Sequence, residues 1–293
     1  MRSITVLFEV TGLRRLIVCA DDFGRDPAIN EAVEAAHRNG ILTTASLMVA
    51  APAAADAVAR AKKLPGLRVG LHLVLVDGRP VLPAVRTAAL IGRDGAFDPN
   101  MARAGVRFFF VPQARHQLEA EIVAQFDAFR ATGLALDHVN AHKHFHLHPT
   151  VANLILAIGR DYGMKAVRLP AEPVAVLRRA FPGEPYRPPL YQPWIELLRR
   201  RLCRAGLVVN DHLFGLVWSG GMTEERLLRL LPHLPDGLNE IYFHPATRRT
   251  PALAAAMPGY RQTDEFAALM SPRVRAHIDK LGIRSTSYGE IPA

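Results

Sequence analysis

The chain has 293 residues, of which 49% are hydrophobic and 22% are charged, so it can bury a full core and is too apolar to be disordered over most of its length. The net charge of +9 comes from 36 basic against 27 acidic residues, and only five of the basic residues are lysines. The arginines are scattered along the sequence without a recognition motif, which argues against nucleic-acid binding.

Cysteine content and apolar runs indicate the cellular compartment. Cys19 and Cys203 lie far apart in the sequence, which excludes a disulfide framework and favours a reducing cytoplasm. No uninterrupted apolar run reaches the ~18 residues that a membrane span needs. Residues 1–14 lack the long apolar core and the cleavage site of a signal peptide. We interpret them as an N-terminal extension before one domain, residues 15–293.

From residue 16 onward, short β-like runs alternate with helical stretches. We predict strands at residues 16–20, 43–49, 67–76, 134–139, 166–169, 207–210, 239–243 and 283–287. We predict helices at residues 27–39, 52–64, 116–132, 149–162, 193–204 and 224–231, and one that opens at Ser271-Pro272. Residues 77–113 show no clean period and predict a long loop, and residues 170–193 predict a proline-rich connection. Seven or eight β/α units predict an α/β fold with a single distorted, TIM-barrel-like (β/α) barrel.

Five of the twelve histidines fall in residues 137–149, at positions 138, 142, 144, 146 and 148. The predicted strand 134–139 leads into them, and Pro149 is typical of the first residue of a helix. The histidines therefore lie at the carboxyl end of a strand, where barrels and open α/β sheets bind ligands. Since neutral imidazole is the commonest protein metal ligand, this stretch predicts part of a metal site.

Polar residues follow other predicted strands as well. Asp21 and Asp22 end the first strand, His72 lies near the end of the third, and His244 follows a later one. Each alone has a structural interpretation, as a helix cap or a core histidine, but their joint position at strand ends favours an active site. One carboxylate and two imidazoles make a metal site with open positions for water and substrate. A second carboxylate can accept a proton, and a histidine across the pocket can protonate a leaving group, so these parts predict a metal-assisted amide or ester hydrolase.

These motifs resemble those of the YdjC-like carbohydrate deacetylases, a family that includes the chitooligosaccharide deacetylases. The matching segments follow the family's order over roughly residues 16–245: Ala20–Gly24, Gly70–Leu73, His138–His142 with His144 and His146, Val167–Pro170 and Glu240–Pro245. Around Phe108–Phe110 and His142–His148 the sequence is most similar to the hopanoid-biosynthesis-associated deacetylases of that family.

The resemblance implies a role for each matching residue. Asp21 would be the general base, and His244 would assist the leaving group. Asp22, His72 and His142 would bind one divalent metal ion, Zn²⁺ or Mg²⁺. Arg168, His144 and Phe109 would contact the substrate. Asn140 departs from the family pattern, which usually has aspartate there, and we expect it to tune the surroundings of the metal ligands.

The implied reaction removes acetate from an N-acetylated amino sugar, and the narrower resemblance implies an N-acetylglucosaminyl group carried on a bacteriohopane polyol. A soluble chitooligosaccharide or other amino sugar is the alternative substrate, and a non-catalytic metal-binding protein is the alternative function. The resemblance also implies a homodimer. A helix with Trp194, Ile195, Leu198 and Leu202 on one side and arginines beside it could contact a membrane surface, or it could be an ordinary barrel helix.

Overall fold

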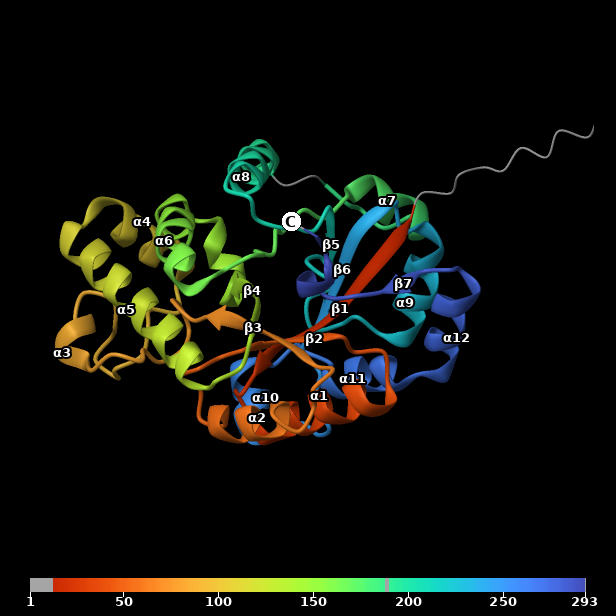
Figure 1. The fold of residues 1–293 in the computed structure, drawn as a ribbon, viewed down its shortest axis with the longest axis horizontal. Helices are drawn as coiled ribbons and strands as arrows, with labels where there is room; N and C mark the ends of the chain where they lie inside the picture. The colour runs from red at the N-terminus through yellow and green to blue at the C-terminus, as the bar shows by residue number, and fades with distance from the viewer. Residues whose placement is uncertain (1–12, 188–189, 293) are drawn as a thin grey trace, which may run out of the picture.

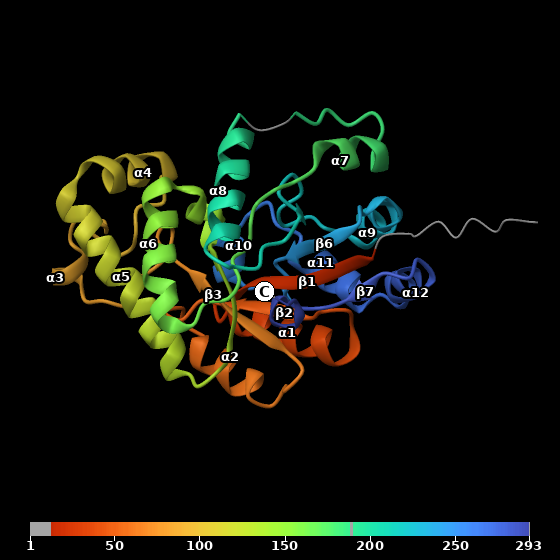
Figure 2. The ribbon, with the colours of Figure 1, turned by 45° about the horizontal axis from the view of Figure 1, so that its top comes forward.

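The computed structural model describes residues 13–187 and 190–292. Within these residues the strands form one parallel sheet in the order β4-β3-β2-β1-β6-β5, and β7 pairs with the start of β1. The strands are β1 Arg14–Phe23, β2 Thr44–Leu47, β3 Arg68–Leu73, β4 Leu136–Ala141, β5 His212–Phe214, β6 Gly237–Phe243 and β7 Arg284–Ser285. Figures 1 and 2 show this curled sheet with the helices on its outer side.

The helices cover the outer side of the sheet, with α1 and α2 below it in Figure 1, α9 and α12 to the right and α5 and α6 to the left. Their bounds are α1 Pro27–Asn39, α2 Ala54–Ala61, α3 Ala84–Thr87, α4 Met101–Phe110, α5 Pro112–Ala131, α6 Pro149–Gly159, α7 Val174–Ala180, α8 Gln192–Arg204, α9 Glu224–Leu230, α10 Pro251–Ala256, α11 Gln262–Met270 and α12 Pro272–Lys280.

Local sequence sets several helix ends as predicted. The Asp26 side chain accepts a hydrogen bond from Ala28 N, Pro27 is the first residue of α1, and Gly40 follows its last residue. Thr223 caps α9 and Ser271 caps α12 in the same way, each accepting a backbone N–H three residues later. These caps satisfy backbone donors that the first turn of a helix leaves unpaired.

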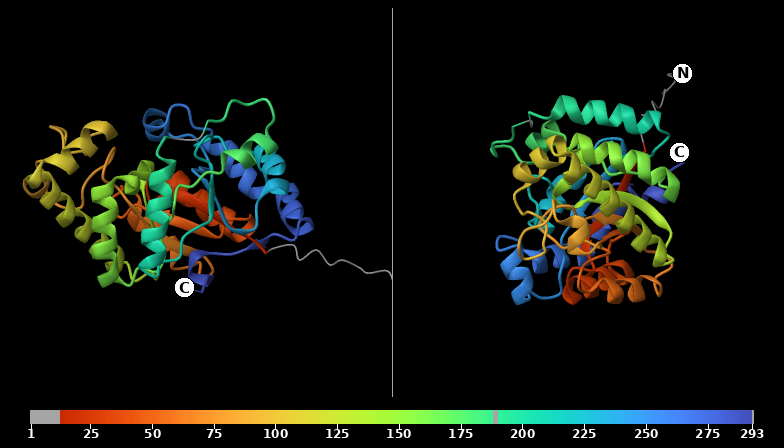
Figure 3. Two further views of the ribbon diagram at one scale, coloured as in Figure 1. Left: turned by 90° about the horizontal axis from the view of Figure 1, so that it is seen from above. Right: turned by 90° about the vertical axis from the view of Figure 1, so that its left-hand side faces the viewer.

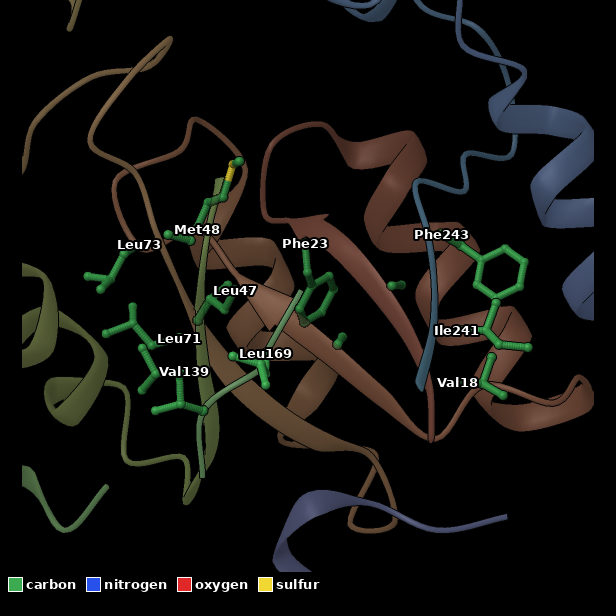
Figure 4. Close-up of a cluster of buried hydrophobic side chains, with 14 of the residues drawn as sticks. Val18, Phe23, Leu47, Met48, Leu71, Leu73, Val139, Leu169, Ile241 and Phe243 are labelled. Atoms are coloured by element: carbon green, nitrogen blue, oxygen red, sulfur yellow. The ribbon is translucent and has the colours of Figure 1, made fainter. Parts of the chain in front are cut away.

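Alternation along β1 divides the core into two layers. Leu16, Val18 and Ala20 belong to the large cluster between sheet and helices, whereas Ile17 and Cys19 belong to a small cluster inside the curl of the sheet. Figure 4 shows part of the large cluster, with Leu47, Leu71 and Val139 on one side of Phe23 and Val18, Ile241 and Phe243 on the other. Because side chains on a strand alternate between its faces, the residues that continue the inner series come to lie inside the curl.

The structure corrects the prediction for residues 77–113 and for two strands. Residues 77–113 contain α3 and α4 rather than only a loop. The continuous Phe108–Phe110 run hid the helical period of α4, because only Phe108 of these three residues is buried. The predicted strands 166–169 and 207–210 form only isolated bridges, Val139 with Val167 and Ala166 with Val208.

Because these two segments form only isolated bridges, the fold is a curled parallel sheet that resembles a distorted barrel. The predicted connection 170–193 contains α7, and the sequence did not predict α10 or α11. The predicted extension, residues 1–14, lies outside the described residues except for Leu13 and Arg14, and Arg14 begins β1. Figure 3 gives two further views of this arrangement.

The apolar side of α8 packs on the protein. Ile195, Leu198 and Leu202 are buried, and the Trp194 indole N–H donates to Leu147 O at 2.7 Å. This side of α8 is therefore not free to enter a membrane interface, which favours the barrel-helix interpretation. No helix in the described part of the chain is long and apolar enough to cross a membrane.

Candidate active site

The polar side chains at the strand ends meet inside the curl of the sheet. They continue the inner series of their strands: Asp21 follows Ile17 and Cys19 on β1, Asn140 and His142 follow His138 on β4, and Tyr242 and His244 follow Leu238 and Glu240 on β6. Polar side chains of the inner series thus gather at the carboxyl ends of the strands, where α/β barrels place their active sites.

Asp22, His72 and His142, the three residues that the resemblance implies as metal ligands, lie close together. Their ligand atoms lie within 4.8 Å of one another, with Asp22 Oδ1 3.4 Å from His72 Nε2 and 3.2 Å from His142 Nδ1. All three residues are buried, yet Asp22 Oδ1 and His72 Nε2 make no hydrogen bond. Buried polar atoms without partners are costly, and one carboxylate with two imidazoles is a donor set that suits a divalent cation. These residues therefore fit the metal that the sequence implies.

Asp22 reaches this position through an unusual backbone conformation. Its φ of 62° lies in the left-handed region, and it turns the side chain out of the strand's alternation. Among the described residues, three other non-glycine residues have positive φ: Asp77, Lys143 and His144. All three line a cavity that Asp21 and His72 also line. Backbone strain of this kind gathers at functional sites, because the surrounding structure must hold it in place.

Asn140 fixes the orientation of a metal ligand and of Asp21 together. Its Nδ2 lies 3.2 Å from Asp21 Oδ1 and 3.0 Å from Ser46 Oγ, and because Asp21 can only accept, Nδ2 must be the donor. Asn140 Oδ1 therefore accepts the 2.7 Å hydrogen bond from His72 Nδ1. With its proton on Nδ1, His72 presents the lone pair of Nε2 towards Asp22, which is the tautomer that metal binding needs.

The same network continues away from the cavity. Because Ser46 accepts from Asn140, its hydroxyl can donate to His138 Nε2 at 3.0 Å, and His138 Nδ1 donates to Asp137 Oδ2 at 2.9 Å. The Ser-His-Asp order resembles a nucleophilic triad, but Ser46 is fully buried and does not line the cavity. We interpret these three residues as support for Asn140.

Asp21 is held by a fully buried guanidinium. Arg168 donates to both oxygens of Asp21, at 2.6 and 2.9 Å, and to Glu240 Oε1 from two nitrogens, at 3.0 and 2.7 Å. The Tyr288 hydroxyl donates to the other oxygen of Glu240 at 2.5 Å. Burial alone would raise the pKa of Asp21, but the charge and hydrogen bonds of Arg168 hold it well below its ordinary value. Asp21 is therefore an ionised acceptor at neutral pH.

A cavity of about 430 Å³ opens in front of these groups. Asp21, His72 and His142 line one part of it, and Tyr242, His244 and Tyr260 line another. His244 Nδ1 is buried and makes no hydrogen bond, and burial lowers the pKa of this imidazole below its ordinary value. The His244 side chain is thus neutral at pH 7 and can both donate and accept a proton.

The structure brings together most of the predicted site residues. Asp21, His72, His142, His144 and His244 line the cavity, with Asp22 buried beside them. His144 Nε2 lies 3.2 Å from the Tyr242 hydroxyl, and burial, together with the charge of Arg168, holds the His144 pKa well below its ordinary value.

Two residues predicted to contact substrate lie elsewhere. Arg168 is buried behind Asp21 and does not line the cavity, so its side chain reaches the carboxylate and not the open space. Phe109 lies on α4 outside the cavity, 47% exposed, against Phe110 and His148. Substrate contact by His144 is the part of this prediction that the geometry favours.

Sequence reasoning did not single out several polar and aromatic residues of the cavity wall. Arg25 pairs with Asp22 at 3.2 Å, and Asp77 pairs with Lys143 at 2.7 Å. Tyr242 lies within the motif that led to His244, and its inward position follows from strand alternation. Tyr260 lies between α10 and α11, and no pattern in the sequence pointed to it.

The chain is similar to known proteins along most of its length. A family model described as YdjC-like protein matches residues 15–280. A carbohydrate deacetylase from Geobacillus stearothermophilus is 30% identical over 278 residues, which cover 94% of this chain and 98% of the relative. A carbohydrate deacetylase from Vibrio vulnificus strain YJ016 is 30% identical over 277 residues, 94% of this chain and 96% of the relative.

A crystal structure shows a similar fold. A protein from Enterococcus faecalis V583, proposed as a cellobiose-phosphate cleavage protein, superposes with a TM-score of 0.75 at 24% identity. The match covers 94% of this chain and 98% of that protein. The curled sheet and its helices are therefore an arrangement that a solved structure shares.

Proposed function

This chain belongs to the YdjC-like protein family, and we propose that it is a metal-dependent carbohydrate N-deacetylase, which hydrolyses the amide of an N-acetylated amino sugar. The observation that carries the proposal is the convergence of Asp22, His72 and His142 beside a separately held carboxylate, Asp21. The names of the relatives from Geobacillus and Vibrio support the carbohydrate substrate and the deacetylation.

The three converging side chains would hold the metal, Zn²⁺ or Mg²⁺. A divalent cation bound there supplies Lewis acidity next to the scissile amide. His72 offers Nε2 because Asn140 holds the proton on Nδ1, and Asp22 is ionised because its His142, His72 and Arg25 neighbours outweigh the effect of burial on its pKa. Asp22 and His72 are therefore preformed as donors in charge and in tautomer. At His142, by contrast, the Asp22 and Asp77 carboxylates outweigh the effect of burial and raise the pKa, so this imidazole must release its proton to bind a metal.

Asp21 would act as the general base. It would take a proton from the water that attacks the acetyl carbon, and Arg168 and Asn140 would hold its carboxylate towards the cavity during that transfer. The C–N bond then breaks, acetate leaves, and the amine takes up a proton. His244 lines the cavity and is a neutral imidazole at pH 7, so it would first accept the proton taken from the attacking water and then deliver it to the leaving amine.

The finer substrate proposal rests on the sequence. The similarity around Phe108–Phe110 and His142–His148 supports an N-acetylglucosaminyl group on a bacteriohopane polyol, with a soluble chitooligosaccharide as the alternative. Tyr242 and Tyr260 line the cavity, and aromatic side chains there suit a sugar ring in either case. A non-catalytic metal-binding protein would need neither these tyrosines nor Asp21. A homodimer, a cytoplasmic location and contact with a membrane surface stay predictions.

Acetate release from N-acetylglucosaminides, measured with the purified protein and each metal in turn, tests the proposal. Product mass should show loss of one acetyl group, and removal of metal by a chelator should abolish turnover. His142→Ala should be inactive, whereas His116→Ala, a substitution at an exposed histidine on α5, should match the parent. Metal uptake without acetate release from any glycoside would favour the non-catalytic alternative.

A further inference from the structure

A second cavity, of about 520 Å³, adjoins the first, and Arg25, Asp77 and Ala256 line both. We propose that it is a binding groove for an aliphatic aglycone carried on the anomeric carbon of the amino sugar. The proposal rests on the proposed deacetylase function and adds to it the place where an aglycone would bind, the residues that would contact it, and a reason to prefer an aliphatic aglycone over a second sugar.

The groove lies on the same rim of the sheet as the catalytic residues. One wall is the segment after β2, with Met48, Ala51 and Pro52, and another is the segment after β3, from Val74 to Arg79. Helix α10 closes the third side with Ala252, Leu253 and Ala256. A group attached to a sugar in the first cavity can therefore pass between Arg25 and Ala256 into the groove.

The lining chemistry differs between the two cavities. The first has two tyrosines among its walls, whereas none of the residues found to line the groove in the described part of the chain is aromatic. The groove walls are mainly aliphatic, from alanine, valine, leucine, methionine and proline side chains. A second sugar would place hydroxyl groups against these aliphatic walls, where they would lose their hydrogen bonds to water without replacement.

The carboxylates at the groove already have partners within the protein. Asp26 accepts hydrogen bonds from Ala28 N at 2.8 Å and from the Thr250 hydroxyl at 2.7 Å. Asp77 pairs with Lys143 at 2.7 Å. These carboxylates serve the fold, so they offer little to the hydroxyls of a glycan.

Of the two arginines at the groove, Arg25 pairs with Asp22 at 3.2 Å, and Arg79 is exposed to solvent and lies 3.4 Å from Asp94 O. The rest of the lining is aliphatic apart from Gly78.

Backbone hydrogen bonds hold the walls in place without a ligand. Met48 N donates to Phe23 O and Ala53 N donates to Gly24 O, each at 2.8 Å. On the opposite wall, Val74 N donates to Gln125 Oε1 at 2.9 Å, and Gln125 Nε2 donates back to Val74 O at 2.7 Å. Because the groove is already formed, binding a ligand there costs little conformational entropy of the protein. More of the free energy from apolar contacts is then available for binding.

The test compares glycosides that share one acetamido sugar and differ only in the aglycone. We would measure kcat/KM for acetate release from methyl, butyl and octyl N-acetyl-β-glucosaminide below micelle-forming concentrations, and from di-N-acetylchitobiose. Each methylene that leaves water should raise kcat/KM about three-fold, so octyl should exceed methyl by on the order of 10³-fold if the whole chain enters the groove. The disaccharide should stay near the methyl glycoside.

Two alanines of α10 provide a matched pair of variants. Ala252 lines the groove, whereas Ala255 is equally exposed on the same helix but lines neither cavity. Ala252→Glu should lower the octyl-to-methyl ratio of kcat/KM at least about ten-fold, because it places a charge against the chain. Ala255→Glu should keep the parent ratio.

The outcomes separate this proposal from the function on which it rests. Acetate release from methyl glycoside without a gain for octyl, or a preference for the disaccharide, would overturn the groove and leave the deacetylase intact. An equal effect of both glutamate variants would also overturn the groove. If no glycoside releases acetate, the proposed function itself is wrong.

Discussion

Arg168 holds the Asp21 carboxylate by both oxygens, at 2.6 and 2.9 Å, in a fully buried pair. The same guanidinium binds Glu240, so one cation compensates two buried carboxylates. The contact orients Asp21 and also lowers its pKa, which weakens it as a base. The contact with Arg168 therefore has two opposite effects on catalysis by Asp21: it places the carboxylate for proton transfer, and it makes the carboxylate a weaker base.

Arg168→Lys should change the pH dependence of the reaction. Lysine keeps the charge but cannot bind both oxygens of Asp21 and also Glu240, so the pKa of Asp21 should rise. We expect kcat/KM at pH 7 to fall about 10²-fold and its acidic limb to move to higher pH, because the base must be ionised to work. Metal content should stay that of the parent. An unchanged acidic limb at reduced activity would mean that Arg168 acts only on the fold.

Asn140→Asp tests the network that joins Asp21 to His72. The new carboxylate could still accept from His72 Nδ1, so metal binding should persist. It would also lie about 3.2 Å from Asp21 Oδ1, where two ionised carboxylates repel. Asp21 keeps Arg168, so the new residue should take up the proton at low pH and donate it to Asp21.

The loss of activity in Asn140→Asp should therefore grow as the pH rises and the new carboxylate ionises. Profiles of kcat/KM between pH 5 and 9 would show a small deficit at the acidic end and about ten-fold or more at the basic end. Ser46→Ala removes the hydrogen bonds of Ser46 to Asn140 and His138 without placing a carboxylate beside Asp21, so it serves as the control, with a deficit that does not depend on pH. A constant deficit in both variants would contradict this account of Asn140.

The alternation of side chains along the strands predicts which residues of the site point inward. Asp21 follows Ile17 and Cys19 at two-residue spacing, and His244 follows Glu240 and Tyr242 in the same way, so their inward direction could be predicted. The strands and most helices of the first half were predicted within a few residues, because buried parallel strands are continuous apolar runs and caps mark the helix ends.

The rest of the site depends on distances that no local pattern encodes. Asp22 leaves the alternation because its φ is positive, and Asp77 and Tyr260 reach the cavity from irregular segments. Arg168 matched the family motif, but its place behind Asp21 follows from tertiary contacts with β1 and β6. Only the folded chain shows that it holds the base.

Substitution of the paired aspartates should separate metal binding from catalysis. Asp22→Asn removes the charge from the metal ligands and should lose the bound metal, since three protein ligands leave little redundancy. Asp21→Asn should keep the metal and slow turnover by something like ~10²–10⁴-fold, as expected for a general base. Metal analysis of the purified variants, alongside kcat, checks both. Metal loss in Asp21→Asn with retention in Asp22→Asn would show that the two roles are reversed.

Glu265 should make the stability of the protein depend on pH. It is buried and accepts hydrogen bonds from Met222 N at 2.8 Å and from His244 N at 2.5 Å, so it ties the His244 segment to α11. Burial raises its pKa from 4.5 to about 8, although both backbone hydrogen bonds lower it. Between these two pH values the folded protein binds a proton that the unfolded chain has released, so the contribution of Glu265 to the free energy of unfolding decreases as the pH rises through this window.

Glu265→Gln cannot titrate, and its amide N–H₂ would face one of the two backbone donors. We expect the variant to be less stable than the parent at pH 5, by about 1 kcal/mol for the lost hydrogen bond, and the difference to shift in favour of the variant towards pH 8. Urea unfolding of both proteins at several pH values measures this difference. Glu225→Gln, at an exposed position on α9, is the control and should show no such shift. A difference between Glu265→Gln and the parent that stays constant from pH 5 to 8 would mean that Glu265 does not titrate in this window.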